Sequence, residues 1–278
     1  IDLSPGGAQP MHSADGRYVI TFNGEIYNYR ELRSQLESKG CTFRSQSDTE
    51  VLLHLYADRD AKMLDALRGM FAFGIWDNLE RTLFLARDPF GIKPLYYADD
   101  GKTIRFASQV KALLAGGKID TTPEAAGHAG FYLWGSVPEP YTLYRGIRAM
   151  PAGHLAVADK DGLRQPTMWC DISKVLAAAA ATPARGDRPT AIAALAEMTR
   201  SAIAAHTIAD VPVGVFLSAG LDSALIASAA ITSAPHSFTL TLGFDEYAGT
   251  ADDEVPAAEA MARMVDAWHT TLMVSRKD

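Results

Sequence analysis

The segment that most constrains this fold is Val211 to Ala227, where a short apolar run is followed by a loop of small residues and a second apolar segment. The run Val211–Leu217 is apolar and rich in β-branched residues, which predicts a strand buried on both faces. Residues 224–227 can then open a helix. A buried strand, a tight loop and a helix N-terminus favour an anion site, because unpaired backbone N–H groups and the helix dipole face outward there.

The loop spans Ser218–Ser223 and reads Ser-Ala-Gly-Leu-Asp-Ser, without the lysine of the Gly-x-x-x-x-Gly-Lys-Ser/Thr phosphate loop. Gly101–Thr103 is half of that motif, but Tyr96 stands where its first glycine is needed, and Asp100-Gly101 predicts a hairpin turn. The loop instead resembles Ser-Gly-Gly-x-Asp-Ser, the pyrophosphate loop of the ATP pyrophosphatases, which split ATP into AMP and pyrophosphate. An ordinary strand-to-helix turn is the alternative interpretation.

Composition excludes several classes of protein. The chain has 278 residues, 48% of them apolar, which makes two domains the natural expectation. Its formal net charge is −7 and its Lys and Arg residues are scattered, so no nucleic-acid partner is expected. No apolar run reaches the roughly 18 residues of a membrane helix, so no membrane partner is expected. Cys41 and Cys170 lack metal-ligand spacing, which favours a reduced, cytoplasmic protein.

The first half of the chain begins with a strand that meets a turn signal. Tyr18–Phe22 is β-branched and aromatic, and Asn23-Gly24 directly after it would by itself indicate a hairpin. Asn28, with Glu31 three residues later, has the pattern of a helix capping box, and Gly40 would end that helix. We therefore expect the strand to run through Asn-Gly-Glu into a helix.

A second capping box, Ser47 with Glu50, predicts a helix whose first turn holds Asp48. The helix dipole favours a carboxylate there, which is the alternative to a binding role for Asp48. We further expect helices at 63–67 and 109–115, and strands at 70–76, 82–86, 95–98 and 103–107. The strand segments are apolar on both faces, which predicts that helices or a second sheet cover both faces.

Several segments of this half resemble the class II glutamine amidotransferases. They are Phe22–Tyr29, Ser47–Glu50, Arg87–Tyr97, Phe106–Ser108 and Met150–His154, the last similar to the closing Leu-Pro-Pro-Gly-His of that domain. In this order, and followed by the Ser218–Ser223 loop, the segments are similar to glutamine-hydrolysing asparagine synthetases over nearly the whole chain.

The resemblance implies an α+β region followed by an α/β region. Residues 1–158 would form a glutamine amidotransferase domain, an αββα sandwich of the N-terminal-nucleophile type without its first strands. Residues 159–189 contain Pro, Gly, charged and Ala residues and are expected to be a linker. Residues 190–278 would begin the synthetase domain, a parallel-sheet, adenine-nucleotide α-hydrolase-like fold. Strands are expected there at 237–244 and 268–274, and helices at 192–203 and 259–265.

By the same resemblance, Asn23 and Gly24 are catalytic residues of an oxyanion hole, which would stabilise the tetrahedral intermediate formed from glutamine. Glu25 and Asp48 would hold the α-amino group of glutamine through charge-assisted hydrogen bonds. The nucleophile of the family is an N-terminal cysteine, about fifty residues before Asn-Gly-Glu. Here 22 residues precede Asn23, and Cys41 is internal. We therefore expect a fragment, cut at both ends, with no glutaminase activity of its own.

The resemblance also implies a site for ATP and Mg²⁺ around the pyrophosphate loop. Its expected residues are Phe216, Ser218, Gly220, Leu221, Asp222, Ser223 and Leu242. Asp222 would orient the Mg²⁺ ion, directly or through water. Phe216 and Leu242 would face the adenine. Ala219 departs from the paired glycines of the family, and we expect a negative φ there, because the neighbouring residues keep the family identities.

The implied reaction is ATP-dependent asparagine synthesis, in which aspartate, glutamine and ATP give asparagine, glutamate, AMP and pyrophosphate. The first alternative keeps this chemistry and changes the acceptor to a sugar acid or a secondary metabolite. The second alternative is a non-catalytic, truncated remnant. The acceptor pocket is expected beyond Asp278, so the acceptor rests on the family alone, and a homodimer stays open.

Overall fold

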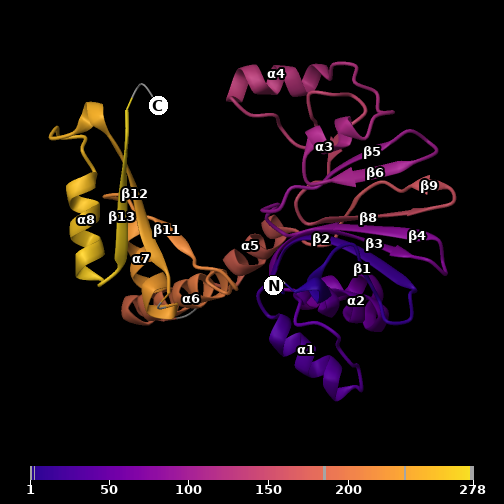
Figure 1. Cartoon of the computed structure of the whole chain (residues 1–278), viewed down its shortest axis with the longest axis horizontal. Helices are drawn as coiled ribbons and strands as arrows, with labels where there is room; N and C mark the ends of the chain where they lie inside the picture. Colours follow the sequence, from indigo (N-terminus) through magenta and orange to yellow (C-terminus); the bar gives the residue numbers. More distant parts are fainter. Residues whose placement is uncertain (1, 3, 184–185, 235, 276–278) are drawn as a thin grey trace. The chain divides into compact units, whose positions relative to one another are not determined.

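The computed structural model describes residues 2, 4–183, 186–234 and 236–275. The chain divides into two compact units, residues 1–183 and 184–278 (Figure 1). The first unit contains two sheets and the second contains one, and each unit has its own cluster of buried apolar side chains. Two domains were the expectation from length, and the described residues divide accordingly.

The first unit is built on a seven-stranded antiparallel sheet. Its strand order is β1-β2-β3-β4-β8-β10, with β9 beside β8. The strands are β1 Met11–His12, β2 Tyr18–Ile26, β3 Gly69–Asp77, β4 Thr82–Arg87, β8 His154–Asp159, β9 Gly162–Leu163 and β10 Thr167–Met168. Along its whole length β2 pairs with β3, from Tyr18 opposite Asp77 to Ile26 opposite Gly69. The Asn-Gly pair therefore lies inside a strand and makes no hairpin turn, as the capping pattern predicted.

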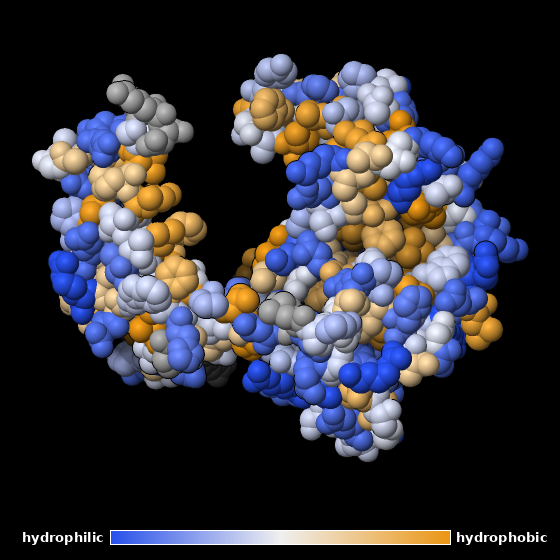
Figure 2. All heavy atoms as spheres, in the orientation of Figure 1, coloured by the Kyte–Doolittle hydropathy of each residue, from blue (hydrophilic) through white to orange (hydrophobic). Residues whose placement is uncertain are grey.

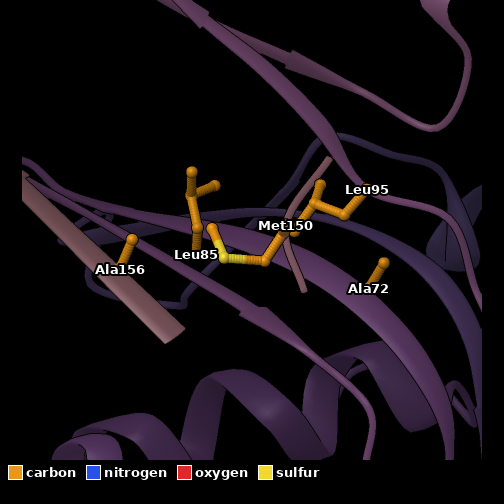
Figure 3. Close-up of a cluster of buried hydrophobic side chains, with 5 residues drawn as sticks. All are labelled: Ala72, Leu85, Leu95, Met150 and Ala156. Atoms are coloured by element: carbon orange, nitrogen blue, oxygen red, sulfur yellow. The ribbon is translucent and has the colours of Figure 1, made fainter. Parts of the chain in front are cut away.

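A smaller antiparallel sheet packs on the first. It has the order β6-β5-β7, with β5 Tyr96–Asp99, β6 Ile104–Ala107 and β7 Arg148–Ala149. The predicted turn at Asp100-Gly101 joins β5 to β6, with Gly101 at φ +78°. Between the sheets lie five buried side chains, which Figure 3 shows: Ala72, Leu85, Leu95, Met150 and Ala156.

Helices cover the outer faces of the two sheets (Figure 1). On the larger sheet lie α1 Tyr29–Ser38, α2 Asp48–Arg59 and the 3₁₀ segment η2 Asp60–Ala66. On the smaller sheet lies α3 Val110–Ala115, whose Leu113 is buried against Ala98 and Ile147. The layers therefore follow the order helix, sheet, sheet, helix, which confirms the predicted αββα sandwich. A short 3₁₀ segment, η1 Pro5–Gly7, precedes β1.

Neither predicted capping box forms. The Asn28 side chain makes no cap bond; it donates to the carbonyl of Ala66 (2.9 Å) and accepts from the N–H of Arg68 (3.0 Å). Ser47 does cap α2, accepting from the N–H of Thr49, but Glu50 accepts from backbone N–H groups of the preceding loop. In both places the side chain expected to cap its own helix instead hydrogen-bonds to a neighbouring loop and attaches that loop to the helix.

The range 159–189, expected to be a linker, is largely structured. It contains β9 and β10, both paired with β8, and the helix α5 Ile172–Ala181. The indole N–H of Trp169 donates to the carbonyl of Arg87 (3.1 Å), which fixes this part of the range to β4. Composition alone predicted a linker because these elements are short and Ala-rich. The helix α4 Ala125–Trp134, for which the sequence gave no expectation, lies in the same unit.

The second unit holds a three-stranded parallel sheet in the order β11-β12-β13, as the alternation of strands and helices predicted. The strands are β11 Gly214–Phe216, β12 Phe238–Phe244 and β13 Trp268–Val274; the helices are α6 Arg188–His206, α7 Leu221–Ser233 and α8 Val255–Met264, with the 3₁₀ segment η3 Asp245–Tyr247. Its core consists of Leu217 with Ala227 of α7 and Ala258 and Ala262 of α8.

The expectation that Val211–Leu217 is buried on both faces is wrong. Val215 packs toward the helices, whereas Phe216 is 70% exposed on the other face. Leu242 and Leu272, directly opposite each other in the β12–β13 ladder, are also exposed. Figure 2 shows hydrophobic atoms gathered on the side of this sheet away from α8. Within the described residues, helices cover only one face of this sheet, which is why the other keeps its apolar side chains exposed.

Candidate functional site

The predicted oxyanion-hole residues lie near the end of β2, where the two sheets of the first unit face each other. The amide Nδ2 of Asn23 donates to the hydroxyl of Ser108, which follows β6, over 3.1 Å. Both residues line a cavity of about 260 Å³ together with Ala72, Leu95 and Phe106. An asparagine amide has two N–H bonds, so one remains to donate to an oxygen in this cavity.

Gly24 lies where the backbone of β2 passes very close to β3. A Cβ at this position would come within 2.2 Å of the carbonyl oxygen of Met70 and within 2.8 Å of the Cα of Phe71. Both atoms belong to backbone, which cannot move aside as the end of a side chain can. A glycine is therefore required for the pairing of these strands.

Asp48 lies at the end of β2 that carries Glu25, although 22 residues separate the two in sequence. The carboxylate of Asp48, at the first position of α2, accepts from the N–H of Ile26 (3.0 Å), the residue after Glu25. Both carboxyl groups are buried, and burial raises the pKa of Asp48. Burial, followed by the negative charge of Glu25, also raises the pKa of Tyr27 to about 12. The structure thus brings two acidic side chains to one end of β2.

A loop beside this site is held by a buried carboxylate. Asp88 is fully buried and follows β4 directly. Its carboxylate oxygens accept from the backbone N–H groups of Phe71, Phe90, Ile92 and Lys93. Sequence reasoning recorded the Arg-Asp-Pro motif and assigned it no role. The sequence signal that could have identified this role is the Arg87-Asp88 pair directly after an apolar strand. A charged side chain buried there needs hydrogen-bond or ionic partners.

Arg87 closes the same loop from the other side. Its guanidinium donates to the carbonyls of Gly91, Lys93 and Met150 and forms an ion pair with Glu139 (2.7 Å). The loop therefore returns on itself and is tied to the segment that precedes β8. This rigid connection keeps the smaller sheet, and with it Ser108, in place beside Asn23.

In the second unit, the predicted pyrophosphate loop joins β11 to α7 and is closed by its two serines. The hydroxyls of Ser218 and Ser223 lie 2.8 Å apart, and the N–H of Ser218 donates to the Ser223 hydroxyl (3.2 Å). The Ser218 hydroxyl in turn accepts from the N–H of Gly220 (3.2 Å). The first-turn N–H groups of α7 have no intrahelical partners, as in any α-helix, and its N-cap, Gly220, has no side chain to accept from them.

The backbone of this loop needs no left-handed residue. Gly220 has φ −74°, and Ala219 is not among the described residues with positive φ. The prediction of a negative φ at Ala219 is therefore confirmed. The alanine that departs from the family pattern adds a methyl group and no backbone strain.

The other predicted ATP residues surround the same loop. Leu221 and Asp222 are exposed in the first turn of α7, with the Asp222 carboxylate in the position that the helix dipole favours. Phe216 pairs with Leu240, so Phe216 and Leu242 are diagonal neighbours on the open face of the sheet. One edge of the second unit thus holds the whole predicted set of ATP residues.

The described residues contain no group of three or more His, Cys, Asp or Glu side chains placed to hold a metal ion. Among them, no helix is both long enough and apolar enough to cross a membrane. Cys41 and Cys170 are free, half-buried thiols.

Two family models match the chain, one in each unit. The glutamine amidotransferase domain matches residues 1–169, and asparagine synthase matches residues 194–278. The first match covers more than half of the chain. Its end at residue 169 agrees with the anchoring of Trp169 to the first unit.

The curated proteins with similar sequences are asparagine synthetases. Asparagine synthetase [glutamine-hydrolyzing] 1 of Bacillus subtilis is 45% identical over 163 residues, which are 58% of this chain and 25% of the relative. Asparagine synthetase [glutamine-hydrolyzing] 3 of the same organism is 38% identical over 173 residues, 61% of this chain and 28% of the relative. A putative asparagine synthetase of Mycobacterium tuberculosis is 43% identical over 154 residues, 54% of this chain and 24% of the relative. The matched region spans about a quarter of the length of these relatives.

Among solved structures, a glutamine phosphoribosylpyrophosphate amidotransferase from B. subtilis is similar with a TM-score of 0.43 and 18% identity, covering 96% of this chain and 49% of that one. The family assignment rests on the sequence matches. Because the first match covers more than half of the chain, the chain belongs to the glutamine amidotransferase domain family, and its second unit is similar to asparagine synthase.

Proposed function

We propose that this chain supplies the glutamine site and the pyrophosphate loop of an ATP-dependent, glutamine-hydrolysing asparagine synthetase. The observation that carries the proposal is the pyrophosphate-type loop at the N-terminus of α7, in the same chain as the amidotransferase sandwich. The loop keeps both serines, mutually hydrogen-bonded, and its exposed carboxylate. A decayed remnant would be expected to lose these side chains before it lost one glycine.

On the glutamine side, we assign Asn23 and Gly24 to the oxyanion hole. The second amide hydrogen of Asn23 and the backbone N–H of Gly24 would donate to the oxygen that becomes negative when the glutamine amide is attacked. Glu25 and Asp48 would hold the α-ammonium group, because two buried carboxylates at one end of β2 form a strong site for a cation. The position of Asn23 in the cavity between the sheets supports its own assignment.

On the nucleotide side, we assign the phosphates of ATP to Ser218, Gly220, Leu221, Asp222 and Ser223. The backbone N–H groups and the serine hydroxyls there fit an anion, and the exposed Asp222 carboxylate fits Mg²⁺, whose preferred ligands are oxygens. When bound, Mg²⁺ would neutralise phosphate charge. Phe216 and Leu242 offer an apolar surface for the adenine. The acceptor would be aspartate and the product asparagine, in agreement with the names of the relatives.

Binding of magnesium pyrophosphate to purified residues 1–278, measured by calorimetry, tests the nucleotide site. We expect Asp222→Ala to weaken binding at least about tenfold, which is about 1.4 kcal/mol. Asp161→Ala, which removes an exposed carboxylate from a turn of the first unit, is the matched control and should leave the affinity unchanged. Equal binding by Asp222→Ala would remove that residue from the site. In a longer protein that contains this chain, release of ADP in place of AMP from ATP would contradict the proposed reaction.

A further inference from the structure

A buried hydroxyl group lies directly behind the start of the pyrophosphate loop. Thr241 is in β12, the central strand of the parallel sheet, and its side chain is on the face that α7 and α8 cover. Central strands of parallel sheets are usually continuous apolar runs, and a buried hydroxyl costs free energy unless it is hydrogen-bonded. Thr241 satisfies this need by donating to the carbonyl oxygen of Leu217 over 2.7 Å.

Leu217 is the last residue before the loop, and it is held in three ways. Its side chain is buried in the core of the second unit beside Ala227 and Ala258. Its N–H donates to the carbonyl of Leu240 (2.9 Å), one residue beyond the last paired position of β11. Its carbonyl accepts from the Thr241 hydroxyl. The backbone on both sides of Leu217 is therefore attached to β12.

The Thr241 hydroxyl acts at the point where strand becomes loop. In a continuing parallel ladder, the carbonyl of Leu217 would accept from a backbone N–H of the neighbouring strand. A side-chain donor at this point satisfies the carbonyl without requiring the chain to continue as a strand. The peptide plane that contains this carbonyl also contains the N–H of Ser218, which donates to the Ser223 hydroxyl.

We propose that Thr241 is a positioning residue for the pyrophosphate loop. By holding the Leu217–Ser218 peptide plane, it sets the direction of the Ser218 N–H and thereby the closed arrangement of Ser218 and Ser223. Its importance for ligand binding rests on the proposed function of the loop. Thr241 itself is buried and does not contact the ligand.

Thr239 provides a matched control in the same strand. It is two residues before Thr241, so it is on the same face, and it is also buried. Its hydroxyl lies 2.8 Å from Nδ1 of His269 and 3.4 Å from the carbonyl of Trp268, both in β13. Replacing Thr239 therefore removes a buried hydroxyl from β12 whose partners lie in β13 and not in the loop.

The experiment compares Thr241→Val, Thr241→Ser and Thr239→Val in residues 1–278. Affinity for magnesium pyrophosphate is measured by calorimetry, and the backbone amide signals of residues 218–223 are recorded by NMR in the ligand-free protein. We expect Thr241→Val to weaken binding by about fivefold or more and to shift these amide signals, because a directing hydrogen bond is lost. Thr241→Ser keeps the hydroxyl and should bind within about twofold of the wild type, as should Thr239→Val.

Two results would overturn the proposal: wild-type affinity in Thr241→Val, or an equal loss of affinity in Thr239→Val, which would show a general effect of destabilising the sheet. If the wild-type chain does not bind pyrophosphate, the proposed function of the loop fails, and the NMR comparison alone decides the role of Thr241. Loop signals that shift in Thr241→Val and stay unchanged in Thr239→Val then support it, and signals unchanged in both refute it.

Discussion

The two candidate sites of this chain differ in which atoms hold them: backbone atoms at the first and side-chain hydroxyls at the second. At the proposed glutamine site, backbone passes close to backbone: a Cβ on Gly24 would meet the Met70 carbonyl at 2.2 Å. At the pyrophosphate loop, side chains provide the contacts, and a Cβ on Gly220 would meet only the hydroxyl oxygens of Ser218 and Ser223, at 3.3 and 3.7 Å. A serine hydroxyl can move aside by rotation about χ1, whereas backbone atoms paired in a β-ladder cannot. The first site should therefore tolerate little change, and the second should adapt.

The surroundings of the two sites differ in the same direction. The larger sheet of the first unit is covered by helices on one face and by the smaller sheet on the other (Figure 1). Within the described residues, the parallel sheet of the second unit has helices on one face only and exposes Phe216 and Leu242 on the other. An atom displaced at the proposed glutamine site therefore disturbs packed side chains, whereas an atom displaced at the loop can move into solvent.

The largest expected difference is between alanine substitutions at the two glycines. Gly24→Ala should destabilise the first unit by at least about 2 kcal/mol, because the new methyl group overlaps the backbone of β3. Gly220→Ala should cost about 1 kcal/mol, because φ is already −74° and the remaining loss is that alanine is a poorer N-cap than glycine. Urea unfolding of both variants, followed by circular dichroism, measures the two effects. Similar losses in the two variants would remove the distinction between a backbone-held and a side-chain-held site.

The second prediction concerns the pH dependence of a buried charge at the glutamine site. Because burial raises the pKa of Asp48, the folded protein binds that proton more tightly than the unfolded chain. The resulting stabilisation is fully present below the unfolded pKa and is lost as pH rises through the folded pKa. The wild type should therefore lose stability relative to Asp48→Asn as pH rises above the unfolded pKa of about 4.

Asp77 provides a control with the opposite sign in the same unit. The hydrogen bonds from Arg17 lower the pKa of Asp77, so its stabilisation is present above the unfolded pKa and is lost as pH falls. Unfolding free energies of wild type, Asp48→Asn and Asp77→Asn, measured across the same pH series, should diverge in opposite directions. Parallel curves would show that burial does not govern the titration of Asp48.

The smallest expected effect is that of Ala219→Gly in the loop. Since Ala219 does not have a positive φ, a glycine there relieves no strain. The affinity of residues 1–278 for magnesium pyrophosphate should change by less than about threefold, under 1 kcal/mol. A gain of tenfold or more would show that the alanine impairs the loop and would favour the non-catalytic remnant.

Several features were predictable because short segments of sequence encode them. The passage of β2 through Asn23-Gly24-Glu25 followed from helix signals directly after it, and the parallel sheet followed from alternating strands and helices. The loop at 218–223 was recognisable from residue types at fixed spacing. Such features depend on backbone conformation and periodicity, which neighbouring residues largely determine.

Only the tertiary structure decided which partners the polar side chains take. Asn28 and Glu50 have the sequence pattern of helix caps, yet both bind loops that fold back onto their helices. The meeting of Asp48 with Ile26, the four N–H groups around Asp88 and the Thr241 bond to Leu217 likewise join segments far apart in sequence. A polar group that loses water must find a partner within hydrogen-bond distance, and which group is within that distance depends on the packing of the whole unit.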